Sequence, residues 1–329
     1  MSLTDLPLKA IDIQESVLTR FHDLLAKGRL AHAYLFVGPA GIGKMSTALA
    51  VAKMIQCETP DRAAGQFFCG VCPGCVKIAS ASHPDVMVTD QGEEASIKIE
   101  QIRGLLSRAR LRSFYGRRKV FIVRNAEVMT TEASNAFLKN LEEPSSDTLI
   151  ILTTGAPEAN LDTIRSRCQM VYFHPIGVDE LAARLKRDGW EEKEAHFLAY
   201  YAEGCPGQAK QMREAGIFQK KKEWLDDFLF SECGDDWIKD LTNDKGATRD
   251  FLAVLRSWVR DGLLLKTGTA AERLMHRDLG EALTRFAARY SFRELEDFDQ
   301  EIIKGLRLLQ DGFNVRVQLN IIRMLIKRD

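Results

Sequence analysis

The chain has 329 residues, 45% of them hydrophobic, so it can bury more than one core and should divide into two or three domains. Lysine plus arginine number 46, as do aspartate plus glutamate, which excludes a global attraction to nucleic acid or to an anionic membrane. The apolar stretches are only strand-sized, and residues 1–12 carry Asp5 and Asp12 instead of a basic segment before an apolar one. We therefore expect a cytoplasmic protein that makes no use of a membrane.

The first half of the chain has the pattern of a parallel α/β domain. A helix is predicted to begin at Thr130 or Thr131, either of which can cap it, with Glu132 in its first turn and its end at Pro144. From about Val178 the strand signals fade and helical spacing takes over, first at 180–188 and 193–203. Strand-sized apolar runs occupy 33–37, 85–89, 120–123 and 149–153, and a helix is predicted at 45–55. This order predicts a parallel sheet followed by a helical part.

A glycine-rich turn lies between the first predicted strand and the helix that follows it. Its glycines allow successive backbone N–H groups to point at phosphate oxygens, and a lysine at its end can reach the terminal phosphates. At the last position of the motif, a thioether replaces the hydroxyl that would hold Mg²⁺, and a thioether is a poor ligand for a hard cation. The sequence predicts a P-loop, with these nucleotide-binding positions: Gly38, Pro39, Ala40, Gly41, Ile42, Gly43, Lys44 and Met45.

An ATPase of this type also needs two carboxylates at the end of a neighbouring strand, one to hold Mg²⁺ and one to activate water. Arg124 and Asn125 occupy these positions, and neither can do that work. Glu127 follows closely and is either a substitute acid or a solvated loop carboxylate. The strand end therefore predicts a site that does not hydrolyse ATP.

Four cysteines lie in the pattern C-x₁₁-C-x₂-C-x₂-C within residues 57–75, and four thiolates can enclose a tetrahedral Zn²⁺. Because four protein ligands leave no open coordination position, such a metal would be structural. The alternatives are a reducible disulfide pair or unrelated buried thiols. The predicted metal ligands are Cys57, Cys69, Cys72 and Cys75, whereas Cys168, Cys205 and Cys233 are interpreted as packing residues.

Residues 163–168 combine a polar turn with two arginines. Arg167 could point out of its own domain and stabilise charge on a phosphate bound by a neighbouring subunit, as arginine fingers do. The alternative is a solvated or salt-bridged side chain.

Several motifs together match a known family. They are residues 29–36 before the P-loop, the four-cysteine insert, Ser82-His-Pro-Asp85, the helix Asn135-Ala-Phe-Leu-Lys-Asn-Leu-Glu-Glu-Pro144, and Ser166-Arg-Cys168. The chain resembles the AAA+ subunits of bacterial replication clamp loaders over nearly its whole length. The resemblance implies an AAA+ P-loop sheet domain (1–176) with a zinc insert (57–75), a small helical lid domain (177–215) and an all-α collar domain (216–329).

Departures from the family pattern distinguish its members. The motor subunits would need Ser or Thr at 45, an acid pair at 124 and 125, and arginine at 207, where this chain has Gly207. The resemblance then implies a non-hydrolysing stator that donates Arg167 in trans, and Thr154 matches the first sensor of the family. The implied partners are gamma/tau and delta subunits in a hetero-pentamer, with the sliding clamp and primed DNA bound through the assembly.

Alternative functions stay open. In the leading interpretation, the chain is a non-catalytic subunit of the polymerase III holoenzyme, and ATP or ADP could bind its P-loop without hydrolysis. One alternative is an active gamma/tau-like motor in which Glu127 and Ser46 have taken over the lost roles. Another is a regulatory nucleotide-binding scaffold that is unconnected to replication.

Two further patterns concern interactions. Helical stripes near the C-terminus predict mostly intramolecular core and belong to the implied collar: Leu306, Leu309, Phe313, Val315, Leu319, Ile322 and Ile326. A local basic run could contact DNA or be a charged helix face: Arg103, Arg108, Arg110, Arg112, Arg117, Arg118 and Lys119.

Overall fold

The computed structural model describes residues 14–59, 66–109, 111–115, 117–143, 147–159, 162–231 and 235–327. These residues form two compact units. The first contains the chain up to Ile176 together with Cys205–Gln208, and the second contains 177–204 and the residues from 209 onward. The finer division of the second half into a lid and a collar stays a prediction.

The first unit is built on a parallel five-stranded sheet with the strand order β2-β3-β4-β1-β5. The predicted parallel α/β architecture is confirmed. Four strands match the apolar runs of the sequence, whereas the fifth was not predicted, because its exposed end residues Gln169 and Tyr172 leave an apolar run of only two residues. The strands are β1 (Ala33–Val37), β2 (Val86–Thr89), β3 (Lys119–Val123), β4 (Thr148–Thr154) and β5 (Gln169–Tyr172).

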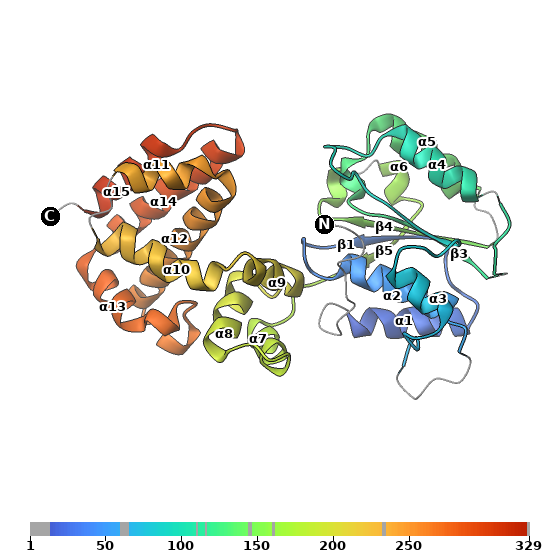
Figure 1. The fold of residues 1–329 in the computed structure, drawn as a ribbon, viewed down its shortest axis with the longest axis horizontal. Helices are drawn as coiled ribbons and strands as arrows, with labels where there is room; N and C mark the ends of the chain where they lie inside the picture. Colours follow the sequence, from blue (N-terminus) through green and yellow to red (C-terminus); the bar gives the residue numbers. More distant parts are fainter. Residues whose placement is uncertain are drawn as a thin grey trace. The chain divides into compact units, whose positions relative to one another are not determined.

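Helices cover both faces of this sheet (Figure 1). Alternate strand residues face opposite layers, so that Tyr34 and Phe36 pack with one group of helices and Leu35 and Val37 with the other. The first group is α1 (Glu15–Ala26), α2 (Lys44–Gln56) and α3 (Pro73–Ala79), and the second is α4 (Ile99–Ala109), α5 (Thr131–Glu142) and α6 (Asp162–Arg165).

Local sequence signals explain where these helices begin. The Thr130 hydroxyl accepts a hydrogen bond from the Ala133 N–H at 3.2 Å, so Thr130, one of the two predicted caps, is the residue that caps α5. The predicted end at Pro144 lies outside the described residues. Gly43 precedes α2 with φ of 98°, a left-handed conformation that favours glycine. The N-terminus of α2 is therefore fixed directly behind the P-loop.

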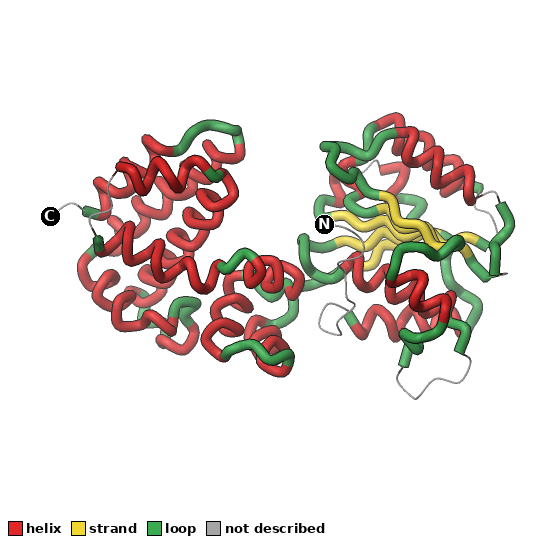
Figure 2. Tube along the Cα trace, viewed as in Figure 1, coloured by secondary structure: helices red, strands yellow, loops and turns green. Residues whose placement is uncertain are grey.

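The second unit is helical throughout its described residues (Figure 2). Its core is centred on a long helix whose Trp258 side chain is fully buried. No helix among the described residues is both long and apolar enough to cross a membrane. The helices of the second half, in chain order, are α7 (Val178–Arg187), α8 (Glu192–Tyr201), α9 (Pro206–Glu214), α10 (Ile217–Leu225), α11 (Asp235–Asn243), α12 (Lys245–Lys266), α13 (Gly280–Arg289), α14 (Phe292–Gln310) and α15 (Arg316–Ile326).

The last helix has two apolar faces. One face is the predicted core stripe, since Val315, Leu319, Ile322 and Ile326 are all buried. Phe313 departs from that prediction, because 60% of its surface is exposed. The second face carries Val317, Ile321 and Met324, which are exposed at helical spacing beyond Phe313. We call Phe313 and these three residues the C-terminal apolar stripe.

Candidate functional site

The predicted P-loop lies between β1 and α2, as the sequence indicated. Gly38 is needed for close packing, because a Cβ atom there would lie 2.6 Å from the Phe173 carbonyl oxygen. Gly41 has φ of 71°, and a Cβ atom there would lie 2.6 Å from the Gln208 backbone nitrogen. The glycines of this motif therefore allow other backbone segments to approach the loop closely.

Lys44 is buried and bonded to its own loop. Its Nζ atom donates to the Pro39 carbonyl oxygen at 2.8 Å and also to that of Gly38. Burial lowers the pKa of Lys44, while the nearby Glu127 carboxylate acts in the opposite direction. The ammonium group that would reach nucleotide phosphates is thus occupied within the chain.

A short segment, Cys205–Gln208, closes over the same loop. The Gly207 N–H donates to the Gly41 carbonyl oxygen at 2.8 Å, and the Gln208 side-chain amide donates to the Ala40 carbonyl oxygen at 2.9 Å. Cys205 is buried in the core beneath. Together with the two bonds from the lysine, these contacts satisfy four consecutive carbonyl groups of the P-loop. We call this segment the P-loop latch.

Position 45 contributes to packing. The Met45 side chain is partly buried against the apolar cluster between the sheet and α2. Ser46, the residue beside it, is 5% exposed. A thioether held in an apolar cluster offers no oxygen ligand to Mg²⁺.

The residues at the end of β3 are engaged in structural contacts. The Arg124 guanidinium lies 3.9 Å from a carboxylate oxygen of Asp90. Asn125 has φ of 55°, its N–H donates to the Thr153 hydroxyl at 3.2 Å, and its side-chain amide donates to Gln91. These two positions thus form a turn that a non-glycine residue rarely adopts and that asparagine tolerates.

Glu127 is the acid that the fold brings beside the P-loop. One of its carboxylate oxygens accepts a hydrogen bond from the Gly155 N–H at 3.0 Å. The other oxygen is buried and has no hydrogen-bond partner among the described residues. The carboxylate interacts electrostatically with Lys44. The first-sensor position, Thr154, is fully buried and its hydroxyl accepts from the Ala156 N–H at 3.1 Å.

The four cysteines of the insert come together. Their sulfur atoms all lie within 4.8 Å of one another, and those of Cys57 and Cys72 are 4.0 Å apart. A tetrahedral zinc site with Zn–S bonds of about 2.3 Å requires sulfur separations of about 3.8 Å. Backbone N–H groups point at the sulfurs, for example from Cys69 to Cys57 at 3.4 Å and from Cys72 to Cys69 at 3.3 Å. This arrangement could hold a metal ion.

The environments of the cysteines differ. A hydrogen bond from Thr59, helped by the N–H of Cys72, lowers the pKa of the Cys69 thiol to about 5. Burial raises the pKa of the Cys75 thiol, which is enclosed at the start of α3. The cysteines that were interpreted as packing residues, Cys168 and Cys205, are buried and are not part of a disulfide, and Cys233 lies outside the described residues.

Arg167 lies just after α6 and reaches toward the end of α5. Its guanidinium forms an ion pair with Glu142 at 2.7 Å and donates to the Thr163 carbonyl oxygen at 2.9 Å. The side chain keeps 34% of its surface exposed. The contacts of Arg167 and the contacts of the P-loop share no residue.

The basic run does not act as one surface. Arg117, Arg118 and Lys119 donate to backbone carbonyl oxygens of Cys57, Leu30 and Ala109, respectively. These three charged groups therefore stabilise contacts within the chain. Arg103, Arg108 and Arg112 are exposed, and Arg110 lies outside the described residues.

Sequence reasoning missed the role of Asp85. Its buried carboxylate accepts hydrogen bonds from the Ser113 hydroxyl and from the N–H groups of Phe114 and Tyr115, at 2.9–3.1 Å. These bonds hold the loop after α4 so that 76% of the Phe114 surface is exposed. The motif Ser82-His-Pro-Asp85 was the available signal, but it does not reveal which loop the acid binds.

Comparisons with known proteins cover most of the chain. The family described as "DNA polymerase III, delta subunit" matches residues 13–177, and its C-terminal counterpart matches residues 218–328. The delta-prime subunit of Bacillus subtilis DNA polymerase III is 28% identical over 93% of each chain. The delta-prime subunit of Pseudomonas aeruginosa is 44% identical over 59% of each chain. The tau subunit of Escherichia coli is 34% identical over 62% of this chain, but that match spans only 32% of tau.

Two solved structures resemble the chain distantly. A gamma-subunit-related protein of Thermotoga maritima aligns with 94% of this chain and 98% of its own, at 18% identity and a TM-score of 0.43. The clamp-loader delta protein of Bacillus subtilis aligns with 94% of this chain and all of its own, at 13% identity and a TM-score of 0.37. These low scores add no weight to the assignment, which rests on sequence. The chain belongs to the DNA polymerase III delta-subunit family, among the delta-prime subunits.

Proposed function

We propose that this chain is a stator of the DNA polymerase III clamp loader, which helps to load the sliding clamp onto primed DNA without hydrolysing ATP itself. The observation that carries this proposal is that the residues at the three positions 45, 124 and 125, which an ATPase needs for catalysis, make structural contacts instead. Met45 packs in an apolar cluster, Arg124 faces Asp90, and Asn125 forms a turn. No Mg²⁺ ligand or water-activating acid stands at any of them.

The P-loop latch supports the same proposal. Its two hydrogen bonds hold the loop's carbonyl groups in their present conformation, and Lys44 directs two of the donors of its ammonium group to its own loop instead of to a phosphate. A nucleotide would therefore have to break contacts that already exist. ATP or ADP binding is possible at that cost, and hydrolysis would still lack its metal and its base.

We propose that Arg167 acts in trans on the nucleotide of a neighbouring gamma/tau motor subunit. Its ion pair with Glu142 is partly exposed, so separating the pair costs about 1 kcal/mol or less. An arginine finger contributes about 10³–10⁵ to the rate of phosphoryl transfer. The gain at the neighbouring phosphate is thus far larger than the loss at Glu142.

We propose that the four cysteines hold one structural Zn²⁺. The ion would have four thiolate ligands, Cys57, Cys69, Cys72 and Cys75, and no open coordination position. It would hold residues 57–75 together and connect α2 to α3. Because the ligands must be thiolates, binding of the ion would release protons from thiols such as Cys75, whose pKa is raised by burial.

We propose that the helical half supplies a collar contact to gamma/tau and delta subunits in a hetero-pentamer. The C-terminal apolar stripe supports this proposal, because Phe313, Val317, Ile321 and Met324 expose apolar surface at helical spacing. Surfaces of this kind mark protein–protein interfaces. The sliding clamp and primed DNA would be bound by the assembly.

A second function, an active ATPase motor, is favoured by Glu127 alone. This carboxylate lies beside the P-loop, has one buried oxygen without a partner, and attracts Lys44. It could polarise water if a nucleotide displaced the latch. The buried Ser46 would then have to replace the missing Mg²⁺ ligand.

The test is ATP turnover by the purified chain, with the motor subunit as the positive control. We expect no hydrolysis above the protein-free rate, and no difference among the wild type, Lys44→Ala and Glu127→Gln. Steady hydrolysis that both substitutions abolish would replace the stator proposal with the motor alternative.

A further inference from the structure

The edge strand β2 leaves hydrogen-bonding groups open. The carbonyl oxygens of Asp85 and Thr89 accept from β3, so the backbone groups of Val86 and Val88 point to the opposite side. The Val86 N–H is used in a turn with the His83 carbonyl oxygen at 3.2 Å. The N–H and C=O groups of Val88 have no partner on that side among the described residues. An edge in this state can pair with another strand.

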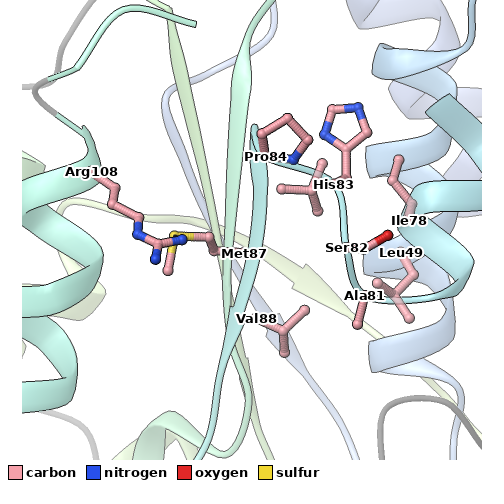
Figure 3. A pocket seen from close by; sticks show the side chains of 10 residues that line it. Leu49, Ile78, Ala81, Ser82, His83, Pro84, Met87, Val88 and Arg108 are labelled. Carbon is pink, nitrogen blue, oxygen red and sulfur yellow. The ribbon is translucent and has the colours of Figure 1, made fainter. Parts of the chain in front are cut away.

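A groove with a volume of about 330 Å³ follows this edge (Figure 3). The strand divides it into two halves of different chemistry. On one side Leu49 and Ile78 lie with Val88, while Met87 and Arg108 lie on the other. The division follows from the pleat, since Val86 packs with the α2 and α3 layer and Met87 with the α4 layer.

Arg108 gives the second half a positive charge. Its guanidinium lies 3.7 Å from the Met87 sulfur, and the side chain is exposed. No carboxylate of the described residues lies within ion-pair distance of it. Arg117, Arg118 and Lys119, which follow in the same run, are bonded to carbonyl groups elsewhere. The groove thus presents a cation whose counter-charge must come from a bound partner.

We propose that β2 accepts an extended acidic peptide of a partner protein as an additional strand. The peptide places an apolar side chain against Leu49 and Ile78 and a carboxylate against Arg108. Because successive side chains of a strand point to opposite faces, the apolar and acidic residues are neighbours in the peptide sequence. The Val88 N–H and C=O groups supply the backbone pairing.

This surface is separate from the P-loop and from Arg167, and it does not rest on the proposed clamp-loading function. Its residues come from α2, α3, the loop between α3 and β2, β2 itself and α4. An experiment on it can therefore fail or succeed independently of any ATPase measurement.

The probe is a fluorescently labelled short peptide in which leucine and glutamate alternate, with a leucine–lysine peptide as its matched control. Anisotropy is measured with the full chain. We expect saturable binding of the glutamate peptide only, and a loss of at least about tenfold in affinity for Arg108→Glu, equivalent to about 1.4 kcal/mol. Arg103→Glu, on the same helix but outside the groove, should bind as the wild type does.

A second variant tests the backbone pairing. Val88→Pro removes the outward N–H and leaves the ladder to β3 intact, because proline is tolerated at an open strand edge. It should abolish peptide binding while the thermal unfolding temperature stays near that of the wild type. Equal binding of both peptides, no binding at all, or unchanged affinity in both variants overturns the proposal. Binding of a labelled oligothymidylate that Arg108→Glu alone removes would assign the groove to nucleic acid instead.

Discussion

Asp261 has a buried carboxyl group in the interior of the helical unit, and the polar groups around it include more hydrogen-bond acceptors than donors. It accepts a hydrogen bond from the His276 N–H at 2.8 Å, but its second oxygen has no partner among the described residues. The Ser257 hydroxyl donates to the Val254 carbonyl oxygen at 2.7 Å, so it must accept from Nε2 of His276. Nδ1 of His276 is then an acceptor without a donor. Burial accordingly raises the pKa of Asp261 to about 6.

This shift predicts the pH dependence of stability. A folded-state pKa above the ordinary value of 3.8 means that the folded state binds the proton more tightly, so the free energy of unfolding falls as pH rises from about 4 to about 6. Asp261→Asn imitates the protonated form. We expect it to match the wild type near pH 4 and to be more stable at pH 7 by about 2–3 kcal/mol. Urea unfolding at both pH values measures this.

The exposed Asp297 provides the control, because Asp297→Asn removes a carboxyl group from the surface instead of the interior and should not stabilise the protein at pH 7 as Asp261→Asn does. An Asp261→Asn variant that is less stable than the wild type at pH 7 would show that the buried charge is favourable in place.

Gly207 makes the P-loop latch possible. A Cβ atom there would lie 2.9 Å from the Gly41 carbonyl oxygen and 3.1 Å from its Cα, both backbone atoms that cannot move aside. We expect Gly207→Ala to lower the free energy of unfolding by about 1–3 kcal/mol. Gly104→Ala in α4 meets no atom within 4 Å and should raise it by about 0.5–1 kcal/mol. Urea unfolding followed by circular dichroism compares the two, and equal effects would refute the latch contact.

Single residues were identified from sequence more readily than their partners were. The spacing of the P-loop glycines and of the insert cysteines depends on local chemistry, which a sequence displays. The engagement of Arg117 and Arg118 with carbonyl groups of Cys57 and Leu30 depends on the fold that brings distant residues together. A run of cations therefore suggested either a nucleic-acid surface or a charged helix face, and the sequence could not show that Arg117, Arg118 and Lys119 bond to carbonyl groups within the chain.

At the scale of elements, the strands that sequence predicted are continuous apolar runs, including β2, of which only Val86 is buried. β1, β3 and β4 are buried at every position and read as continuous apolar runs. β5 (Gln169–Tyr172) pairs with β1, but both of its end residues are exposed and only Met170 and Val171 between them are apolar, so its composition carries no such signal. Residues 169–172 are therefore extended because they pair with β1, and not because of their local sequence.

Under the proposed zinc site, the four-cysteine insert is the element whose stability depends most on a ligand. We expect the purified chain to contain about one zinc ion, and chelation to lower its thermal unfolding temperature, because metal binding free energy contributes directly to folding. The Cys72→Ser variant should contain less zinc and should likewise have a lower thermal unfolding temperature. Elemental analysis and calorimetry measure both effects.

Cys168→Ser serves as the matched control, since Cys168 lies outside the insert and should leave the zinc content unchanged. Fresh protein with well under one zinc per chain, or a chelated protein of unaltered stability, would contradict the metal site.

For the whole molecule, the sequence predicted the sheet domain and the helical second half, because helical and strand periodicities differ throughout. It could not show that one stripe of α15 is buried and the adjoining stripe exposed, since both are apolar at the same spacing. In the proposed function, the exposed stripe and Arg167 both act only in the presence of other subunits. The proposed function accordingly concerns an assembly.

The rate of ATP hydrolysis by the reconstituted assembly tests this account most directly. Chains carrying Lys44→Ala, Arg167→Ala or Arg165→Ala are combined with the motor and delta subunits, the clamp and primed DNA. We predict the wild-type rate with Lys44→Ala and with Arg165→Ala, and a rate at least about 10²-fold lower with Arg167→Ala. An unchanged rate with Arg167→Ala, or an equal fall with Lys44→Ala, would contradict the account.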